Sequence, residues 1–513
     1  MEATEKVFFL RALDKIEKAG NALPNPATLF IILSFIIIVI SDISARLALS
    51  VTFETFNAAE NAITVQNVNA ISLLSHDGIR FIVTSFVSNF TGFFPMGVVF
   101  TIMIGVAIAD RTGFLAAILR RLAKITSSKA LTPMVVFLGV MSNIASSTGY
   151  VVLVPLGAIL FISFKRHPVA GLAAAFAGVS GGWAANLFIA TNDPVFASIT
   201  TMAARIINTG YEVTPVGNWY FLVVSTFLIT ILGTLVTDKI IEPRLGKYEA
   251  LESVVVDDIS KDEKRGLKWA GIATLVYIGI ILLLLVPEGA VLRHPVTGGI
   301  LASPFMSGLI FFMMLLFLIS GLAYGIGAKV IKSDNDVIEM MTQTIQSIAG
   351  FLVLIFFAAQ FVAYFNYSNL GLILAIRGAE FLSGIGFVGL PLMVAFIFLT
   401  ALIDLVFAVD TAKWAMMAPI FVPMFMQLGF SPELTQLAYR IGDSTSNMIA
   451  PLMPFFPMML AFVQRYNKKA GIGTVFSLML PYSVIFLLGW IVLFVAWYLI
   501  GLPLGPGAGL TYP

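Results

Sequence analysis

One apolar run with basic residues at both ends constrains the fold of this chain more than any other feature. Lys129 precedes the run 130–164, and Lys165 and Arg166 follow it. Basic loops stay on the cytoplasmic side of a membrane, so both ends of the run are expected on that side. About 35 residues are too few for two comfortable transmembrane helices of about 20 residues each. The run therefore predicts a re-entrant hairpin that enters the membrane and returns.

The centre of this run is polar and includes Asn143, Ser146 and Ser147. Non-helical backbone at membrane depth is stable only where it is buried in protein or lines a water-filled cavity. Such a tip favours a transporter over a membrane anchor. Its hydroxyl and amide oxygens suit a hard cation such as Na⁺. Small polar residues also mediate ordinary helix packing in membranes, and that alternative stays open here.

The whole chain is strongly apolar, with 59% hydrophobic residues, 11% charged residues and a mean hydropathy of +0.96. We expect an all-α polytopic membrane protein with about nine transmembrane helices and two re-entrant hairpins, the second over 380–429. The expected spans are 28–48, 92–110, 168–192, 218–237, 269–287, 303–326, 338–366, 433–464 and 473–500.

The distribution of basic residues supports this topology. With a cytoplasmic N-terminus, a first hairpin that opens inward and a second that opens outward, 23 of the 30 Lys and Arg residues lie inside. Five lie outside, and Lys413 and Arg440 lie within the membrane. If either hairpin were a simple crossing, the basic bias would invert for every later loop.

The two hairpins also resemble each other in sequence. Aligning Pro155 with Pro419 places Ser147 opposite Thr411. Related segments that enter from opposite sides predict two inverted repeats, and secondary transporters place their site between such repeats. The expected parts are an amphipathic cytoplasmic segment (1–27), the first repeat (28–237), a charged cytoplasmic linker (238–268), a connecting transmembrane helix (269–287) and the second repeat (303–500).

The segment from Tyr439 to Asn447 carries two charges inside an expected span. Arg440 and Asp443 are i, i+3 neighbours on a helix face. Intramembrane charges are costly and usually mark substrate or ion pathways. Arg440 is suited to hold a carboxylate, and Asp443 to bind a cation or a proton. Alternatively, the two form a mutual ion pair that only fixes helix packing.

Two further segments offer charged candidates. At the expected tip of the second hairpin, Asp410 and Thr411 precede Trp414, whose indole could stack on a flat ring; the alternative is a water-facing tip with a packed tryptophan. Asp193 resembles a carboxylate at a helix break, although it could also lie at the outer interface. Asp404 is expected to be buried, with no assigned role.

The sequence does not favour an enzyme or a cofactor-binding protein. It has no cysteine, no phosphate-binding loop and no H-E-x-x-H motif, so we expect neither an enzyme nor a bound cofactor. The basic residues are dispersed over loops, so nucleic acid is not an expected partner. The expected partners are a small anionic substrate and membrane lipid.

The chain resembles the AbgT family of p-aminobenzoyl-glutamate transporters, within a larger ion-transporter superfamily, over nearly its whole length. The motifs that carry the resemblance are Gly20–Pro24, Ala145–Val152, Asn192–Pro194, Ala412–Ala415, Ala418–Phe425, Tyr439–Ser444 and Pro451–Pro454. The resemblance implies a homodimer in the bacterial inner membrane that transports p-aminobenzoyl-glutamate, with sulfonamide export in some members. It assigns functional roles to Trp414, Arg440, Asp443, Pro432 and Pro451. It also places Thr411 where the family has a hydroxyl residue, usually serine.

The chain departs from the family pattern at the hairpin tips. The family has an aspartate where this chain has Ser147, and a small residue where it has Asp410. We hypothesise that the carboxylate has moved between hairpins, which would preserve one negative charge at the site.

These observations predict a secondary active transporter for p-aminobenzoyl-glutamate or a similar small anion, which works by alternating access. The alternative is a proton-driven efflux pump for sulfonamide antimetabolites. The expected substrate-binding residues are Arg440, Trp414, Thr411, Asn143, Ser147 and Asn447. The expected ion-coupling residues are Asp443, Asp410, Ser146 and Asp193, with H⁺ or Na⁺ as the coupling ion, and with Na⁺ placed at the hairpin tips. Pro432 and Pro451 are the expected helix breaks.

Overall fold

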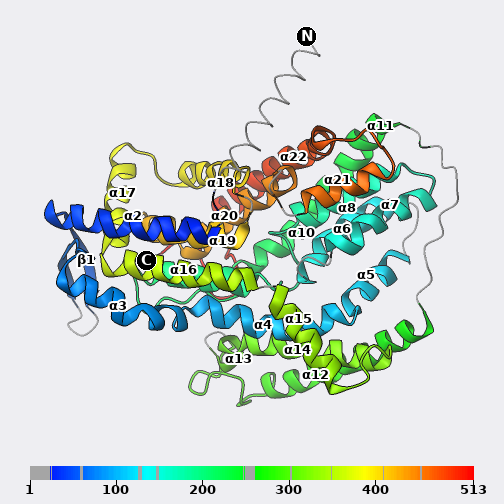
Figure 1. Cartoon of the computed structure of the whole chain (residues 1–513), viewed down its shortest axis with the longest axis horizontal. Helices are drawn as coiled ribbons and strands as arrows, with labels where there is room; N and C mark the ends of the chain where they lie inside the picture. The colour runs from blue at the N-terminus through cyan, green and yellow to red at the C-terminus, as the bar shows by residue number, and fades with distance from the viewer. Residues whose placement is uncertain are drawn as a thin grey trace, which may run out of the picture.

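The fold is almost entirely helical (Figure 1). The computed structural model describes residues 24, 26–57, 62–124, 130–145, 149–246, 248, 260–300, 303–347, 349–407, 409–450, 453 and 455–512. Within these residues the strands are one antiparallel pair, β1 (Ser50–Asn57) and β2 (Ala62–Asn69), with Ser50 opposite Asn69. Most of the expected 1–27 segment lies outside the described residues.

Seven helical stretches in the described part are long and apolar enough to cross a bilayer. They are α2 (Pro26–Arg46), α3 with α4 (His76–Thr91 and Phe94–Arg111), α10 with its extension (Trp219–Leu245), α12 (Lys261–Leu285), α14 (Leu309–Gly327), α16 (Ala349–Tyr367) and α22 (Ile472–Ile500). Each overlaps an expected span, so a polytopic α-helical membrane fold is confirmed. α12 starts earlier than expected, because Ser260 and Glu263 form a capping box within the 238–268 segment.

The run 130–164 folds as two short helices joined by a break. α6 (Leu131–Ser142) and α7 (Val154–Ser163) flank the break, and a π-helical turn, η3 (Gly149–Leu153), leads into α7. The outer ends of the run lie together, since Arg166 donates to Thr132 at 2.6 Å. Arg166 also pairs with Asp238 at 2.6 Å and with Glu242, which ties both ends to the end of α10.

Both arms of this hairpin pack closely on α8 (Pro168–Gly181) through glycines. A Cβ atom on Gly139 would lie 2.7 Å from the Cα of Gly178. A Cβ on Gly157 would lie 2.6 Å from the carbonyl oxygen of Gly171. Small residues let helix backbones approach in membranes, where apolar burial between helices gives little drive.

Gly139→Leu is therefore expected to destabilise the protein by roughly 1–3 kcal/mol or more, because overpacking pushes α6 away from α8. Thermal unfolding in detergent micelles measures this effect. Gly97→Leu is the matched control, since no atom lies within 4 Å of the new Cβ on α4. Equal melting temperatures for the two variants would contradict the close packing of α6 on α8.

The second hairpin is shorter than expected. It consists of α18 (Leu390–Asp404) and α19 (Asp410–Gln427), whereas the expected start at residue 380 lies inside the separate helix α17 (Leu370–Gly384). Gly386 and Gly389, with positive φ angles of 71° and 70°, lie in the loop that separates α17 from α18.

Two expected spans are broken helices. The 168–192 span is helical only to Gly181, and a new helix, α9 (Asp193–Ala204), follows an irregular segment. The 433–464 span consists of α20 (Pro432–Ser446), a 3₁₀ turn (Asn447–Ile449) and α21 (Phe456–Gln464). Each half of the chain thus supplies a helical hairpin followed by a broken helix. The charged side chains described below gather near these two breaks.

Other elements were not expected from the sequence or were expected only in part. They are the β1–β2 pair, α3, α5 (Phe114–Lys124), α9, α11 (Glu242–Leu245), α13 (Pro304–Ser307), α15 (Asp334–Ser347) and α17. In Figure 1, α12 and α14 lie side by side at one edge of the molecule, while α18, α19 and α20 lie near its centre.

Candidate functional site

The charged side chains expected inside the membrane gather where the second hairpin meets the two broken helices. α20 supplies Arg440 and Asp443, the first turn of α19 supplies Asp410 and Lys413, and α9 supplies Asp193. α19 packs on both α9 and α20, so residues far apart in sequence come together.

Arg440 forms a buried ion pair with Asp193, with 2.7 Å between a terminal guanidinium nitrogen and Oδ1. The side chains are only 3% and 2% exposed. The other oxygen of Asp193 accepts the backbone N–H of Ala190 at 2.6 Å. The Nε of Arg440 is buried without a hydrogen-bond partner, so the guanidinium keeps donor capacity for a further acceptor. Asp193 is therefore buried within the protein.

Lys413 lies between two aspartates. Its Nζ pairs with Asp404 and, at 2.7 Å, with Oδ1 of Asp443. All three side chains are buried. Asn447 donates to the second oxygen of Asp443 at 3.0 Å. The alternative of a mutual Arg440–Asp443 pair is therefore wrong in this structure, because each residue pairs with a partner from another element.

Trp414 is fully buried and held by both its nitrogen and its ring. Its Nε1 donates to Thr200 Oγ1 at 2.9 Å. Thr200 in turn donates to Gln436 at 2.6 Å, and Gln436 donates to Asn218 at 2.7 Å. The indole ring lies 4.4 Å from the Tyr439 ring, tilted by 34°. The position of this ring is thus fixed by a chain of buried hydrogen bonds.

Asp410 begins α19 and has no ion-pair partner among the described residues. Its side chain accepts from Trp183 Nε1 at 2.7 Å, from Asn192 at 3.4 Å and from the backbone N–H of Thr411 at 2.6 Å. Tyr439 donates to its backbone carbonyl at 2.6 Å. Thr411 is half-buried beside it.

The first hairpin brings only part of its expected site into the described structure. Asn143 is buried and donates to the carbonyl of Val179 at 3.1 Å, and its own Oδ1 has no hydrogen-bond partner. Ser146 and Ser147 lie outside the described residues, as does Pro451. Pro432 occupies the start of α20, where its missing N–H is tolerated, so it begins a helix instead of breaking one.

Sequence reasoning missed several residues of this site. It placed Lys413 in the membrane without a role, left Asp404 unassigned, and gave no role to Trp183, Thr200, Gln436 or Asn218. For Lys413 and Asp404 the sequence did carry a signal, because ionisable residues inside a membrane usually have charged partners. Which partners they have depends on tertiary packing.

These six charged side chains comprise two basic and four acidic groups: Arg440, Lys413, Asp193, Asp404, Asp410 and Asp443. Fully ionised, the cluster has a net charge of −2. Buried charges without counter-ions are strongly disfavoured, so the site is suited to take up protons or other cations. Among the described residues no group of three or more His, Cys, Asp or Glu side chains is arranged to hold a metal ion.

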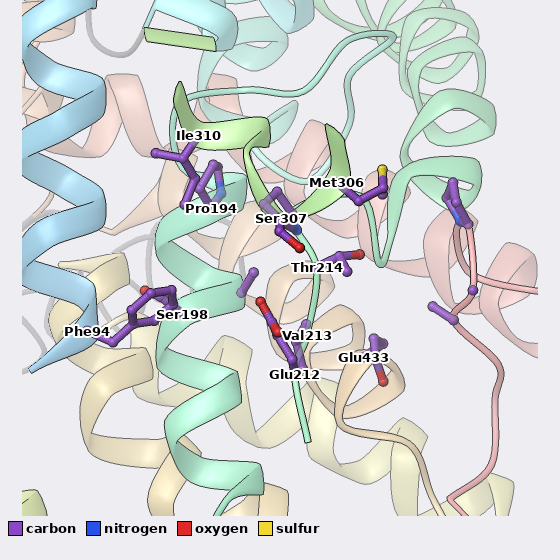
Figure 2. A pocket seen from close by; sticks show the side chains of 15 residues that line it. Phe94, Pro194, Ser198, Glu212, Val213, Thr214, Met306, Ser307, Ile310 and Glu433 are labelled. Atoms are coloured by element: carbon purple, nitrogen blue, oxygen red, sulfur yellow. The ribbon is translucent and has the colours of Figure 1, made fainter. Parts of the chain in front are cut away.

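A separate cavity of about 330 Å³ lies against the first turns of α9 (Figure 2). Pro194 and Ser198 line it from α9, Glu212 from the following loop, and Glu433 from the start of α20. Tyr211 donates to Glu433 at 2.9 Å. Ligand pockets typically enclose about 300–1,000 Å³. Pro194, which follows Asp193 in sequence, lines the cavity, whereas Asp193 and Arg440 do not.

Comparison with known proteins gives consistent matches over nearly the whole chain. The model of the "AbgT putative transporter family" matches residues 11–512. The p-aminobenzoyl-glutamate transport protein of Escherichia coli K12 is 38% identical over 492 residues, which cover 96% of this chain and 95% of that protein.

Two solved structures share this fold. The YdaH transporter of Alcanivorax borkumensis is 42% identical, with a TM-score of 0.87 over 94% of this chain and 100% of that one. MtrF of Neisseria gonorrhoeae, described as illuminating a class of antimetabolite efflux pumps, is 45% identical, with a TM-score of 0.91 over 97% of this chain and 99% of that one.

Proposed function

Because this chain belongs to the AbgT transporter family, we propose that it moves p-aminobenzoyl-glutamate, or a similar small anion, across the membrane by ion-coupled alternating access. The buried Arg440–Asp193 pair carries this proposal. Arg440 is suited to bind a substrate carboxylate in two-point geometry. The indole of Trp414 is fully buried against Tyr439 here, so we expect it to contact the aromatic ring of the substrate in another state of the transport cycle.

The pairing suggests how ion and substrate movements are linked. Two-point binding of a substrate carboxylate to Arg440 engages the terminal nitrogen that now contacts Asp193, and we propose that it displaces Asp193 from that nitrogen. Asp193 left as a bare anion would be buried without a counter-ion, which is costly, so it takes a proton as the substrate binds. Proton and substrate then occupy the site together, which favours symport.

Uptake of labelled p-aminobenzoyl-glutamate into proteoliposomes tests this function. Accumulation under an inward proton gradient, and none under a Na⁺ gradient, is the expected result. Accumulation under the Na⁺ gradient alone would show that Na⁺, and not the proton, is the coupling ion. No accumulation under either gradient would reject this substrate.

Antimetabolite efflux is a second candidate, favoured by the 45% identity with MtrF. It predicts that an inward proton gradient expels a labelled sulfonamide from preloaded vesicles. Retention of the drug with and without the gradient would reject it.

Asp410→Asn is expected to weaken gradient-driven accumulation while substrate still binds, because the variant removes a carboxylate that has no ion-pair partner among the described residues. Binding in detergent and accumulation in proteoliposomes separate the two effects. Unchanged accumulation would reject the hypothesis that this carboxylate replaces the one absent at Ser147.

A homodimer in the bacterial inner membrane, with a cytoplasmic N-terminus, completes the proposal. The family resemblance supports the dimer, and the long apolar faces that α12 and α22 leave exposed support the location in a membrane. Light scattering of the purified protein measures the oligomeric state, and a monomeric mass would contradict the dimer.

A further inference from the structure

We propose that Asp404, Lys413 and Asp443 together form a proton-binding site, in which Asp404 takes up the proton and Lys413 sets the number of protons held. The inference rests on the proposed function, because it assigns a further coupling site to the same transporter. It concerns a carboxylate to which neither motif nor comparison gives a role.

Close packing of α18 on α20 brings the two carboxylates together. A Cβ atom on Gly442 would lie 2.4 Å from the carbonyl oxygen of Ile397, so only glycine permits this approach. Asp404 ends α18 about two turns beyond Ile397, and Asp443 is adjacent to Gly442. The first turn of α19 then inserts Lys413 between them.

One negative charge in this triad is left over. Lys413 neutralises one carboxylate, and both aspartates are fully buried. Asp443 has Lys413 on one oxygen and Asn447 on the other, at 2.7 and 3.0 Å. The Oδ2 of Asp404 is buried without a hydrogen-bond partner, since the nearby Ser446 hydroxyl donates to the backbone carbonyl of Gly442 at 2.7 Å instead. An anionic oxygen in that position is strongly disfavoured, so Asp404 is the member of the triad that binds the proton.

Among the described residues, the groups around the triad do not supply a second positive charge. Asp410 and Tyr439 face the triad from α19 and α20, and Tyr150 faces it from the first hairpin. Arg440, the other buried cation of the site, is paired with Asp193.

A proton fits this site better than Na⁺. The ammonium group already contacts both carboxylates, so a Na⁺ bound to the same carboxylates would place a second positive charge close to it where water is excluded. A proton from water instead adds directly to Oδ2 of Asp404 and brings the triad to zero net charge.

Charge counting gives a test with opposite expectations for two variants. Asp404→Asn leaves a neutral Lys413–Asp443 pair, so the ratio of protons to substrate should fall by one. Accumulation under a gradient of about one pH unit should fall about tenfold, the factor that one coupled proton supports. Adding Lys413→Met to Asp404→Asn leaves Asp443 alone, so the net charge returns to −1 and the lost proton should return.

The readouts are substrate uptake in proteoliposomes and proton movement reported by an entrapped pH dye. Glu380→Gln, an exposed carboxylate on α17, is the matched control and should behave like the parent protein. Asp404→Asn should also melt no lower than the parent, since the neutral amide keeps the triad at the zero net charge that the bound proton provides.

An unchanged proton ratio in Asp404→Asn would overturn the inference. So would a double variant as uncoupled as the single one, or an Asp404→Asn protein that does not fold, because either outcome indicates a packing role. If the parent protein itself moves no substrate, the proposed function fails instead.

Discussion

Arg440→Ala is expected to lower kcat/KM for an anionic substrate by about 100-fold, since truncating one partner of a buried charge pair costs roughly 2–5 kcal/mol. The loss has two sources. The substrate carboxylate loses its guanidinium, and Asp193 is left buried without the partner that lies 2.7 Å away. Transport assays with p-aminobenzoyl-glutamate and with its uncharged diester measure the effect.

The diester should lose much less activity than the diacid, because Arg440 discriminates by charge. A paired Arg440→Gln and Asp193→Asn variant controls for the unpaired aspartate, since it removes both charges and keeps polar side chains of similar size. Equal losses for charged and neutral substrates would contradict the assigned role of Arg440.

Lys413→Met is expected to destabilise the protein by roughly 3–5 kcal/mol, the typical cost of leaving a buried charge without its partner. It leaves Asp404 and Asp443, which both contacted the same ammonium group, close together without a cation. Unfolding in detergent micelles measures this cost.

The double variant Lys413→Met with Asp404→Asn should recover part of the lost stability, because one of the two facing carboxylates is gone. Arg377→Met provides a control, since it breaks an exposed pair with Glu380 that contributes at most about 1 kcal/mol. A Lys413→Met protein as stable as this control would show that the triad is not held together by charge.

The helical hairpins were predictable from sequence because their cause is local. The basic residues on either side of 130–164 and the polar centre of that run indicate a chain that turns back within the membrane. Arg166 does contact Thr132 from the other end of the run. The start of the second hairpin was misplaced because apolar composition continues through Gly386 and Gly389, and only their positive φ angles separate α17 from α18.

The ion pairs could not be predicted, because their partners come from elements far apart in the chain. Spacing alone pointed to Arg440 and Asp443 as a pair on one helix face. In the structure Arg440 turns to Asp193 on α9, and Asp443 turns to Lys413 on α19. Close packing at Gly442 brings α18 near enough for Asp404 to join Lys413 and Asp443. A close approach of two helices has no periodic signature in the sequence.

The exchange of partners at Arg440 can be measured as proton uptake on substrate binding, followed with a pH indicator in weakly buffered detergent solution. We expect binding of p-aminobenzoyl-glutamate to draw protons from solution, and we expect Asp193→Asn to take up about one fewer per substrate because its amide needs none to release Arg440. Binding without proton uptake, or with equal uptake in the parent and in Asp193→Asn, would contradict the exchange of partners at Arg440.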